Sequence, residues 1–301
     1  MAQGVGVRFN TSGVRILKIE KADDGMKINA IAAGLPGETF ISFTESKQIT
    51  FDDASVAFGL GPGDFLAACL KNNNGMDDDE QKEQLRWEIE RKILSDPSGY
   101  NFDYFISGGM GFVFAGRKNL INEVISSVGN ALTDVEPVAL LNSCDSSGEC
   151  GDGTSMLLSI EAGGISSVIV ENGMPLAIDS YLINEPDIAS VMSGLNMENI
   201  SQMEDSLVEK LVGHVFKSVN RLTSFAENKD NPTPDKLILA GSGVYAGKLV
   251  SMIEDKYGIN VVISDPFTAL TNNAADINPE LENLNAAFTT CFGLALRAME
   301  V

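Results

Sequence analysis

The sequence predicts an α/β protein made of two similar halves, because one hairpin pattern occurs twice and strand-like and helix-like segments alternate around it. An apolar run, a small polar turn and a second apolar run span Gly4–Ile19, and the pattern returns over Leu157–Gly173. Each pattern is typical of two antiparallel strands joined by a tight loop. We expect two lobes that each turn a loop of backbone N–H groups toward a shared cleft, which is the layout of a nucleotide-binding clamp.

Strands are expected to dominate residues 4–70. Short apolar runs at Met26–Ala32 and Ala54–Leu60 are separated by Gly, Pro and Asp residues, as strands usually are. A further strand is predicted at Gly111–Gly116.

Two helices are predicted in the first half. The acidic loop Asn72–Glu80 leads into a helix over Glu83–Leu94, because acids are favourable near a helix N-terminus and Pro97 ends the run. Trp87 lies off the apolar stripe of this helix, and packing on the small subdomain is favoured over a role as an anchor for a partner. Residues 118–132 carry apolar positions at helical spacing.

In the second half a long helical region is predicted from about 185 to 226, followed by a buried strand at Lys236–Ala240. That strand runs into the glycine-rich turn Gly241–Gly247 and then a helix. This arrangement brings backbone N–H groups and a helix N-terminus to one spot, where an anion or a nucleotide base can bind. A strand at Val261–Ser264 and a C-terminal helix over Leu284–Met299 complete the half.

We place the boundary between the halves after residue 143. The first half, 1–143, includes an inserted small subdomain over about 40–110, and the second half spans 144–301. Four cysteines are too few for a disulfide framework, and Cys144 and Cys150 are expected in a flexible loop at the boundary. His214 is expected to be a helix residue and not a catalytic base.

The charge of the chain argues against nucleic acid as a partner. Its 42 acidic and 21 basic residues give a net charge of −21, which repels phosphate backbones and anionic lipids and attracts basic peptides. No apolar run approaches the roughly 18 residues that span a bilayer, and the N-terminus lacks the pattern of a signal peptide. We therefore expect a cytoplasmic protein.

Taken in order, these features resemble the actin-like (ribonuclease H-like) ATPase superfold, and within it the PilM family of type IV pilus assembly proteins, which is related to the cell-division protein FtsA. Besides the two hairpins, the segments that carry the resemblance are Leu85–Ile93, Val135–Leu141, Gly241–Gly247, Asp265–Phe267 and Gly293–Arg297. The resemblance covers nearly the whole chain and implies a two-lobed fold with duplicated halves.

The chain departs from the family where nucleotide chemistry is expected. In the first hairpin Arg8 stands at the family's aspartate, Asn10 at a glycine and Arg15 at a lysine. In the second hairpin the family has Asp-Ile-Gly, and this chain has Ser159, Ile160 and Glu161. Carboxylates that organise Mg²⁺ are thus missing, and phosphoryl transfer depends on such positioning. The departures predict a pseudo-ATPase with neither a catalytic residue nor a metal site.

Nucleotide binding without hydrolysis stays open, because arginine is a good phosphate ligand. ATP and Mg²⁺ are the cofactors that such binding would involve. The resemblance places the degenerate nucleotide cleft at Asn10, Thr11, Ser12, Arg15, Gly163, Gly164, Gly241, Ser242 and Gly243.

For function, the resemblance implies a cytoplasmic scaffold of a type IV pilus or related secretion machine. It would bind the cytoplasmic N-terminal peptide of an inner-membrane PilN-like protein in a groove between subdomains, plausibly as an extended strand, and would reach the membrane through that partner. Assembly into a homo-oligomer stays open.

Two alternatives remain. One is an active ATPase or sugar-kinase-like phosphotransferase, for which Asp152 and Asp179 are the best carboxylates. The other is a filament protein similar to FtsA, which would carry a C-terminal amphipathic membrane helix; the sequence up to Val301 offers none.

Overall fold

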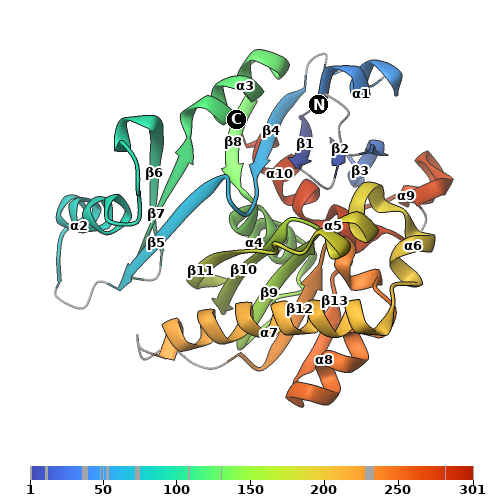
Figure 1. The fold of residues 1–301 in the computed structure, drawn as a ribbon. Helices are drawn as coiled ribbons and strands as arrows, with labels where there is room; N and C mark the ends of the chain where they lie inside the picture. The colour runs from blue at the N-terminus through green and yellow to red at the C-terminus, as the bar shows by residue number, and fades with distance from the viewer. Residues whose placement is uncertain are drawn as a thin grey trace.

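The structure is a computed structural model in which two lobes stand one above the other and a small subdomain projects from the first (Figure 1). It describes residues 2–10, 13–35, 40–47, 49, 51, 54–71, 75–107, 109–129, 131–227, 234–281 and 283–300.

A five-stranded sheet forms the first lobe. Its strand order is β3 (Gly25–Ala33), β2 (Gly13–Ala22), β1 (Gln3–Asn10), β4 (Ser55–Leu60) and β8 (Ala131–Val135). The first three strands are antiparallel neighbours, and β1, β4 and β8 are parallel. The predicted opening hairpin is confirmed.

The second lobe repeats this sheet. Its order is β11 (Met174–Leu182), β10 (Gly164–Glu171), β9 (Thr154–Glu161), β12 (Lys236–Ala240) and β13 (Asn260–Ile263). The pairing directions match those of the first lobe strand by strand. The prediction of two like α/β halves is therefore confirmed at the level of topology.

The small subdomain is a three-stranded antiparallel sheet covered by one helix. The sheet has the order β5 (Phe65–Lys71), β7 (Met110–Arg117) and β6 (Tyr100–Ser107), and α2 (Asp78–Glu90) packs on it. The predicted range of about 40–110 also takes in β4, which pairs within the first lobe instead.

Helix α2 both begins and ends earlier than predicted, since it starts at Asp78, inside the expected acidic loop, and not at Glu83. The Asp77 carboxylate accepts hydrogen bonds from the backbone N–H groups of Asp79 and Glu80, which caps the N-terminus. The helix ends at Glu90 and not at Leu94. Trp87 is 59 % exposed with the Arg91 guanidinium 4.6 Å from its ring centroid, so the prediction that Trp87 packs into the subdomain is wrong.

Two helices, α4 (Glu136–Ser147) and α10 (Thr289–Met299), pack against each other between the lobes. Their backbones come close because glycines allow it: a Cβ atom on Gly293 would lie 1.7 Å from the carbonyl oxygen of Ala139. Helix α10 also lies on β1, where a Cβ on Gly6 would stand 1.8 Å from the carbonyl oxygen of Cys291. The proposed boundary at 143/144 falls inside α4.

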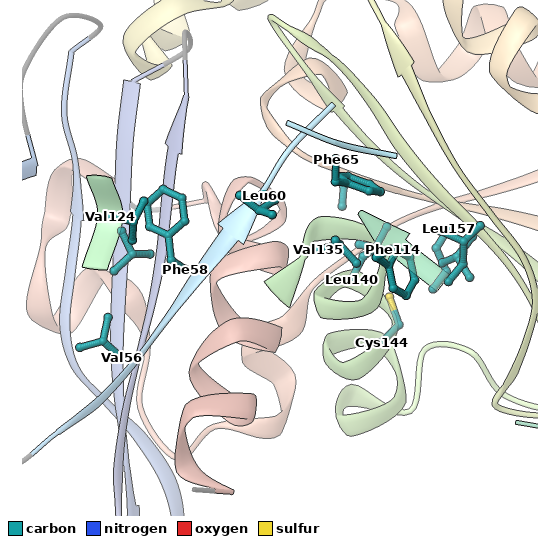
Figure 2. Close-up of a cluster of buried hydrophobic side chains, with 14 of the residues drawn as sticks. Val56, Phe58, Leu60, Phe65, Phe114, Val124, Val135, Leu140, Cys144 and Leu157 are labelled. Carbon is teal, nitrogen blue, oxygen red and sulfur yellow. The ribbon is translucent and has the colours of Figure 1, made fainter. Parts of the chain in front are cut away.

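One large apolar cluster joins all three parts of the molecule. Figure 2 shows Phe58 of β4, Phe114 of β7, Leu157 of β9 and Cys144 of α4 among its members. Cys144 is fully buried on the helix, so its predicted place in a flexible loop is wrong, whereas Cys150 lies beyond the helix and is also buried.

Strands dominate residues 4–70, as predicted, and one short helix, Phe40–Ser46, lies among them with Phe43 in the core. One other expectation on local structure was wrong. Leu132 belongs to β8 and not to the preceding helix, which stops at Gly129 with φ of 83°. The remaining helices are α1 (Phe40–Ser46), α3 (Lys118–Val128), α5 (Pro186–Met192), α6 (Met197–Ser201), α7 (Asp205–Glu227), α8 (Leu249–Tyr257) and α9 (Ala274–Ile277).

His214 lies on α7, as expected. Its Nδ1 atom is 3.1 Å from the Tyr181 hydroxyl, and burial lowers the pKa of the imidazole. Short 3₁₀ helices complete the fold at Pro97–Gly99, Ser193–Leu195, Ser242–Tyr245, Pro266–Ala269, Pro279–Leu281 and Asn285–Phe288. Within the described ranges, no helix is both long and apolar enough to cross a membrane.

Candidate functional site

A buried network of charged side chains joins the two lobes at the ends of the hairpins. Arg8 of β1 and Arg15 of β2 come from the first lobe, and Glu161 is the last residue of β9 in the second. Glu136, the first residue of α4, completes the set. Each of the four residues is at most 4 % exposed, so the charges meet away from water.

Glu161 is held by donors from both lobes. Its Oε2 atom lies 2.8 Å from Nη2 of Arg15, and its Oε1 atom lies 3.0 Å from Nη1 of Arg8 and also contacts Nη1 of Arg15. Ser242 donates its backbone N–H to Oε1 at 3.2 Å and its hydroxyl to Oε2. The carboxylate thus has partners for both of its oxygens.

Glu136 pairs with the other side of Arg8. The Nη2 atom of Arg8 lies 3.1 Å from Oε2 of Glu136, and Nε of Arg8 donates to Oε1, which makes the pair bidentate. Ser166 of β10 donates its hydroxyl to Oε2 at 2.9 Å. Because Glu136 begins a helix, the helix dipole favours its negative charge.

The environment favours the ionised forms of Glu161 and Arg8. Burial raises the pKa of Glu161, but Arg15, Arg8 and the hydrogen bonds outweigh it and bring that pKa down to about 2. For Arg8, burial lowers the pKa, yet Glu136 and Glu161 raise it above its usual value. Two positive charges balance two negative ones. Asp64 lies close by in the loop after β4, and burial raises its pKa.

A second feature is a groove between the small subdomain and the first lobe. Strand β6 lines one side of it, β8 lines the other, and α4 and α10 contribute at one end. Two neighbouring cavities of about 610 Å³ and about 260 Å³ make up the groove. Both are lined by Asp103, Phe114, Thr133 and Asp134.

Apolar and acidic side chains line the groove, and we call the apolar ones its floor. Phe105, Phe114, Leu132, Val138 and Leu141 supply apolar surface, and Asp103, Asp134, Asp145 and Glu300 supply the acids. Burial raises the pKa of Asp134 to about 6, with the nearby Asp103 and Glu300 acting in the same direction and Arg297 opposing them. Arg297 bonds to Glu300, with Nη1 2.7 Å from Oε2.

Comparison with solved structures settles the fold. Over 99 % of both chains, with 18 % identity and a TM-score of 0.72, the structure matches a chain of a PilM–PilN type IV pilus biogenesis complex. It also matches a protein of Bacteroides thetaiotaomicron with an actin-like ATPase fold, at 15 % identity, a TM-score of 0.52 and 93 % and 95 % coverage. The chain has the actin-like fold. The sequence itself matches no protein-family model and no curated protein.

The actin-like fold brings part of the predicted nucleotide cleft together. Arg15, Gly241 and Ser242 meet at the Glu161 carboxylate. Gly241 has φ of 87°, and a Cβ there would lie 2.4 Å from the carbonyl oxygen of Ile160 and 2.9 Å from Oε1 of Glu161. Gly243 packs on Ile160 in the same way.

The other predicted cleft residues lie around this actin-like cleft in different settings. Gly163 is in the turn between β9 and β10, and Gly164 begins β10, where a Cβ would stand 2.4 Å from the carbonyl oxygen of Tyr181. Asn10 ends β1 and pairs with Gly13 across the first hairpin. Thr11 and Ser12 lie outside the described residues.

Two carboxylates named for an active enzyme lie elsewhere. Asp152 precedes β9, at the opposite end of that strand from Glu161. Asp179 lies on β11, where its Oδ1 atom is 3.0 Å from Nη2 of Arg221. Across the described part of the chain, His, Cys, Asp and Glu side chains form no group of three or more that could hold a metal ion.

Glu136 and the residues that line the groove were not identified from the sequence, which implied a groove between subdomains only through the family resemblance. The segment Val135–Leu141 was singled out, but nothing in its pattern says that Glu136 faces Arg8, which lies 128 positions away. Asp103 and Asp134 did carry a signal, since each is an acid within a strand of mostly apolar or neutral residues. Only the fold brings these two strands to the same cavity.

Proposed function

We propose that this chain is an actin-like scaffold protein of a type IV pilus or related secretion machine, and that it binds the cytoplasmic N-terminal peptide of an inner-membrane PilN-like protein. The observation that carries the proposal is the acidic, apolar-floored groove between β6 and β8. The likeness to a chain of a PilM–PilN complex supports it.

The backbone of the groove suits an extended peptide. Strand β6 ends the order β5-β7-β6, and β8 ends the order of the first sheet, so each has one edge outside its ladder. Edge strands offer N–H and C=O groups to an added strand, which supplies affinity, while side-chain pockets supply specificity. The apolar floor would receive alternate side chains of such a peptide.

The charge of the groove suits a basic peptide. Four acids line it, and Arg297, which bonds to Glu300, carries the one positive charge among its described lining residues. A cation on the peptide would stabilise the ionised form of Asp134. The net charge of −21 adds long-range attraction for a basic tail next to a membrane. The protein would then lie at the cytoplasmic side of the inner membrane through its partner.

The alternative, an ATPase or phosphotransferase, has less support from the cleft. ATP and Mg²⁺ do not fit the residues present: Glu161 places a carboxylate among the donors that a phosphate would use, and Arg8 and Arg15 are already paired with Glu136 and Glu161. A buried carboxylate facing a triphosphate is strongly unfavourable. We therefore propose that the cleft neither hydrolyses nor requires nucleotide.

The test is fluorescence polarisation with a labelled synthetic peptide that copies the cytoplasmic N-terminus of the PilN-like protein from the same organism. The variant Asp103→Lys reverses an exposed charge on β6 and should weaken binding about tenfold, or 1.4 kcal/mol. Its matched control is Glu254→Lys, an exposed charge reversal on α8. A peptide with N-methylated backbone amides should bind at least about tenfold more weakly than the plain peptide.

Equal affinity of the Asp103→Lys and Glu254→Lys variants would remove the groove from the proposal. Equal affinity of the plain and N-methylated peptides would exclude strand addition. Absence of binding by the unmodified protein would overturn the proposed partner.

A further inference from the structure

We infer that the buried charge network between the lobes is an oxyanion site whose occupant is supplied by the chain itself, the carboxylate of Glu161. The site is made by Arg8, Arg15 and Ser242, and its ligand class is a small carboxylate or phosphate. This inference goes beyond the proposed function and does not depend on the peptide groove.

The donors around Glu161 form a site of the kind that binds anions. Arg8 and Arg15 direct guanidinium N–H groups at the carboxylate, and Ser242 adds its backbone N–H and its hydroxyl. Ser242 begins a turn that follows a strand, and such turns commonly present N–H groups to phosphates or carboxylates. Guanidinium groups match the planar oxygens of a carboxylate in the same way.

The backbone makes room for this carboxylate. Gly241 stands so close that a Cβ atom would lie 2.9 Å from Oε1 of Glu161. On the other side of the network, a Cβ on Gly61 would lie 3.1 Å from Oε1 of Glu136. A side chain at Gly241 would press on the Glu161 carboxylate and one at Gly61 on the Glu136 carboxylate, so each glycine leaves room for one acid of the network.

The Glu161 carboxylate, as the occupant of the site, also links the two lobes. Glu161 and Ser242 belong to the second lobe, and both arginines belong to the first. Arg15 further donates to the carbonyl oxygen of Ala287 at 3.0 Å, just before α10. Occupancy by a separate ligand would depend on the concentration of that ligand, whereas the Glu161 side chain is always present. The lobe arrangement is therefore independent of nucleotide.

The test is chemical rescue. Glu161→Ala removes a CH₂–COO⁻ group, which acetate can replace, and leaves two buried arginines with one carboxylate. At pH 7 in chloride the melting temperature should fall by roughly 5–15 °C. Acetate at 100 mM should restore roughly half of that loss compared with the same concentration of chloride, and inorganic phosphate should also restore part of it.

Glu171→Ala is the matched control, since Glu171 lies at the far end of β10 from the cleft. The Glu171→Ala variant and the unmodified protein should each have the same melting temperature in acetate as in chloride. Glu161→Gln, of the same shape but uncharged, should also lower the melting temperature. If Glu161→Ala fails to fold in chloride, it should yield folded protein when refolded in acetate.

Three results would overturn the inference. One is a Glu161→Gln variant as stable as the unmodified protein. Another is a Glu161→Ala variant whose loss of stability is the same in acetate, phosphate and chloride. The last is a Glu161→Ala variant that folds in neither buffer. None of these experiments involves the peptide, so they can fail while the proposed function stands.

Discussion

The cleft between the lobes and the groove beside the small subdomain are built from the same kinds of side chain but differ in how their charges are matched. In the cleft, Arg8 and Arg15 meet Glu136 and Glu161 in equal number, and all four are buried. In the groove, acids exceed the arginine among the described lining residues. The charges in the cleft are balanced within the protein, whereas the groove has an excess of negative charge that a partner could pair with.

The two regions shift carboxyl pKa values in opposite directions. Burial raises the pKa in both places, but at Glu161 the two arginines reverse the effect, and the pKa falls to about 2. At Asp134 the more distant Arg297 does not compensate, and the pKa rises to about 6. A buried acid is thus a stabilising element when its cation is buried with it, and a candidate recognition group when the cation must come from outside.

The largest effect is expected from a substitution that disturbs the balance of charges in the cleft. Arg8→Met leaves the buried Glu136 without its cation while Glu161 keeps Arg15, so the free energy of unfolding should fall by about 3 kcal/mol. Glu136→Leu in the same chain restores a one-to-one ratio of charges and should recover much of this loss. Urea unfolding of the two single variants and the double variant measures the coupling energy.

The matched control for this cycle is Arg297→Met in the groove, where the side chain is 48 % exposed and pairs with Glu300. The Arg297→Met substitution should lower the free energy of unfolding by less than about 1 kcal/mol, as is usual for exposed ion pairs. If Arg8→Met and Arg297→Met cost the same, the contrast between the two regions does not hold.

A smaller effect of opposite sign is expected at Asp134. Its pKa is about 6 in the folded protein and near 3.8 in the unfolded chain, so ionisation destabilises the fold above pH 6. Asp134→Asn keeps an oxygen to accept the Val135 N–H and should stabilise the protein by about 1–3 kcal/mol at pH 7.5. The gain should shrink as the pH falls through 6 and vanish below about 3.8.

Thermal unfolding from pH 2 to 8 measures this gain against the unmodified protein. Glu161→Gln gives the opposite profile, because the folded pKa of Glu161 is lowered: its cost should be complete above about pH 4.5 and shrink as the pH falls toward 2. A stability gain for Asp134→Asn that does not vary with pH would point to packing and not to ionisation.

The last prediction is that nucleotide does not change the stability of the protein. Millimolar Mg·ATP should leave the melting temperature unchanged, whereas a ligand at 100 times its dissociation constant would add about 2.7 kcal/mol to the native state. Differential scanning fluorimetry measures this, with Mg²⁺ alone and Mg·GTP as controls. A clear rise with Mg·ATP would show that the nucleotide displaces Glu161 and that the cleft is not self-occupied.

Much of the fold could be predicted from local patterns. Alternating apolar residues around small polar turns gave both hairpins, and the apolar periodicity around Leu211 gave helix α7. Errors arose where neighbours decided the outcome. Cys144 was expected in a flexible loop because its neighbours are polar, but it lies on helix α4 and is buried against the core.

By itself, the sequence determined the two hairpins, since hydrophobic alternation and turn residues act over short distances. It also determined that arginines and a glutamate replace the residues expected at a nucleotide cleft. Only the tertiary structure decided that Arg8 meets Glu136 and Glu161, and that Asp103 and Asp134 face one groove. Charges attract without regard to position in the chain, so these pairings follow from how the lobes pack and have no local pattern.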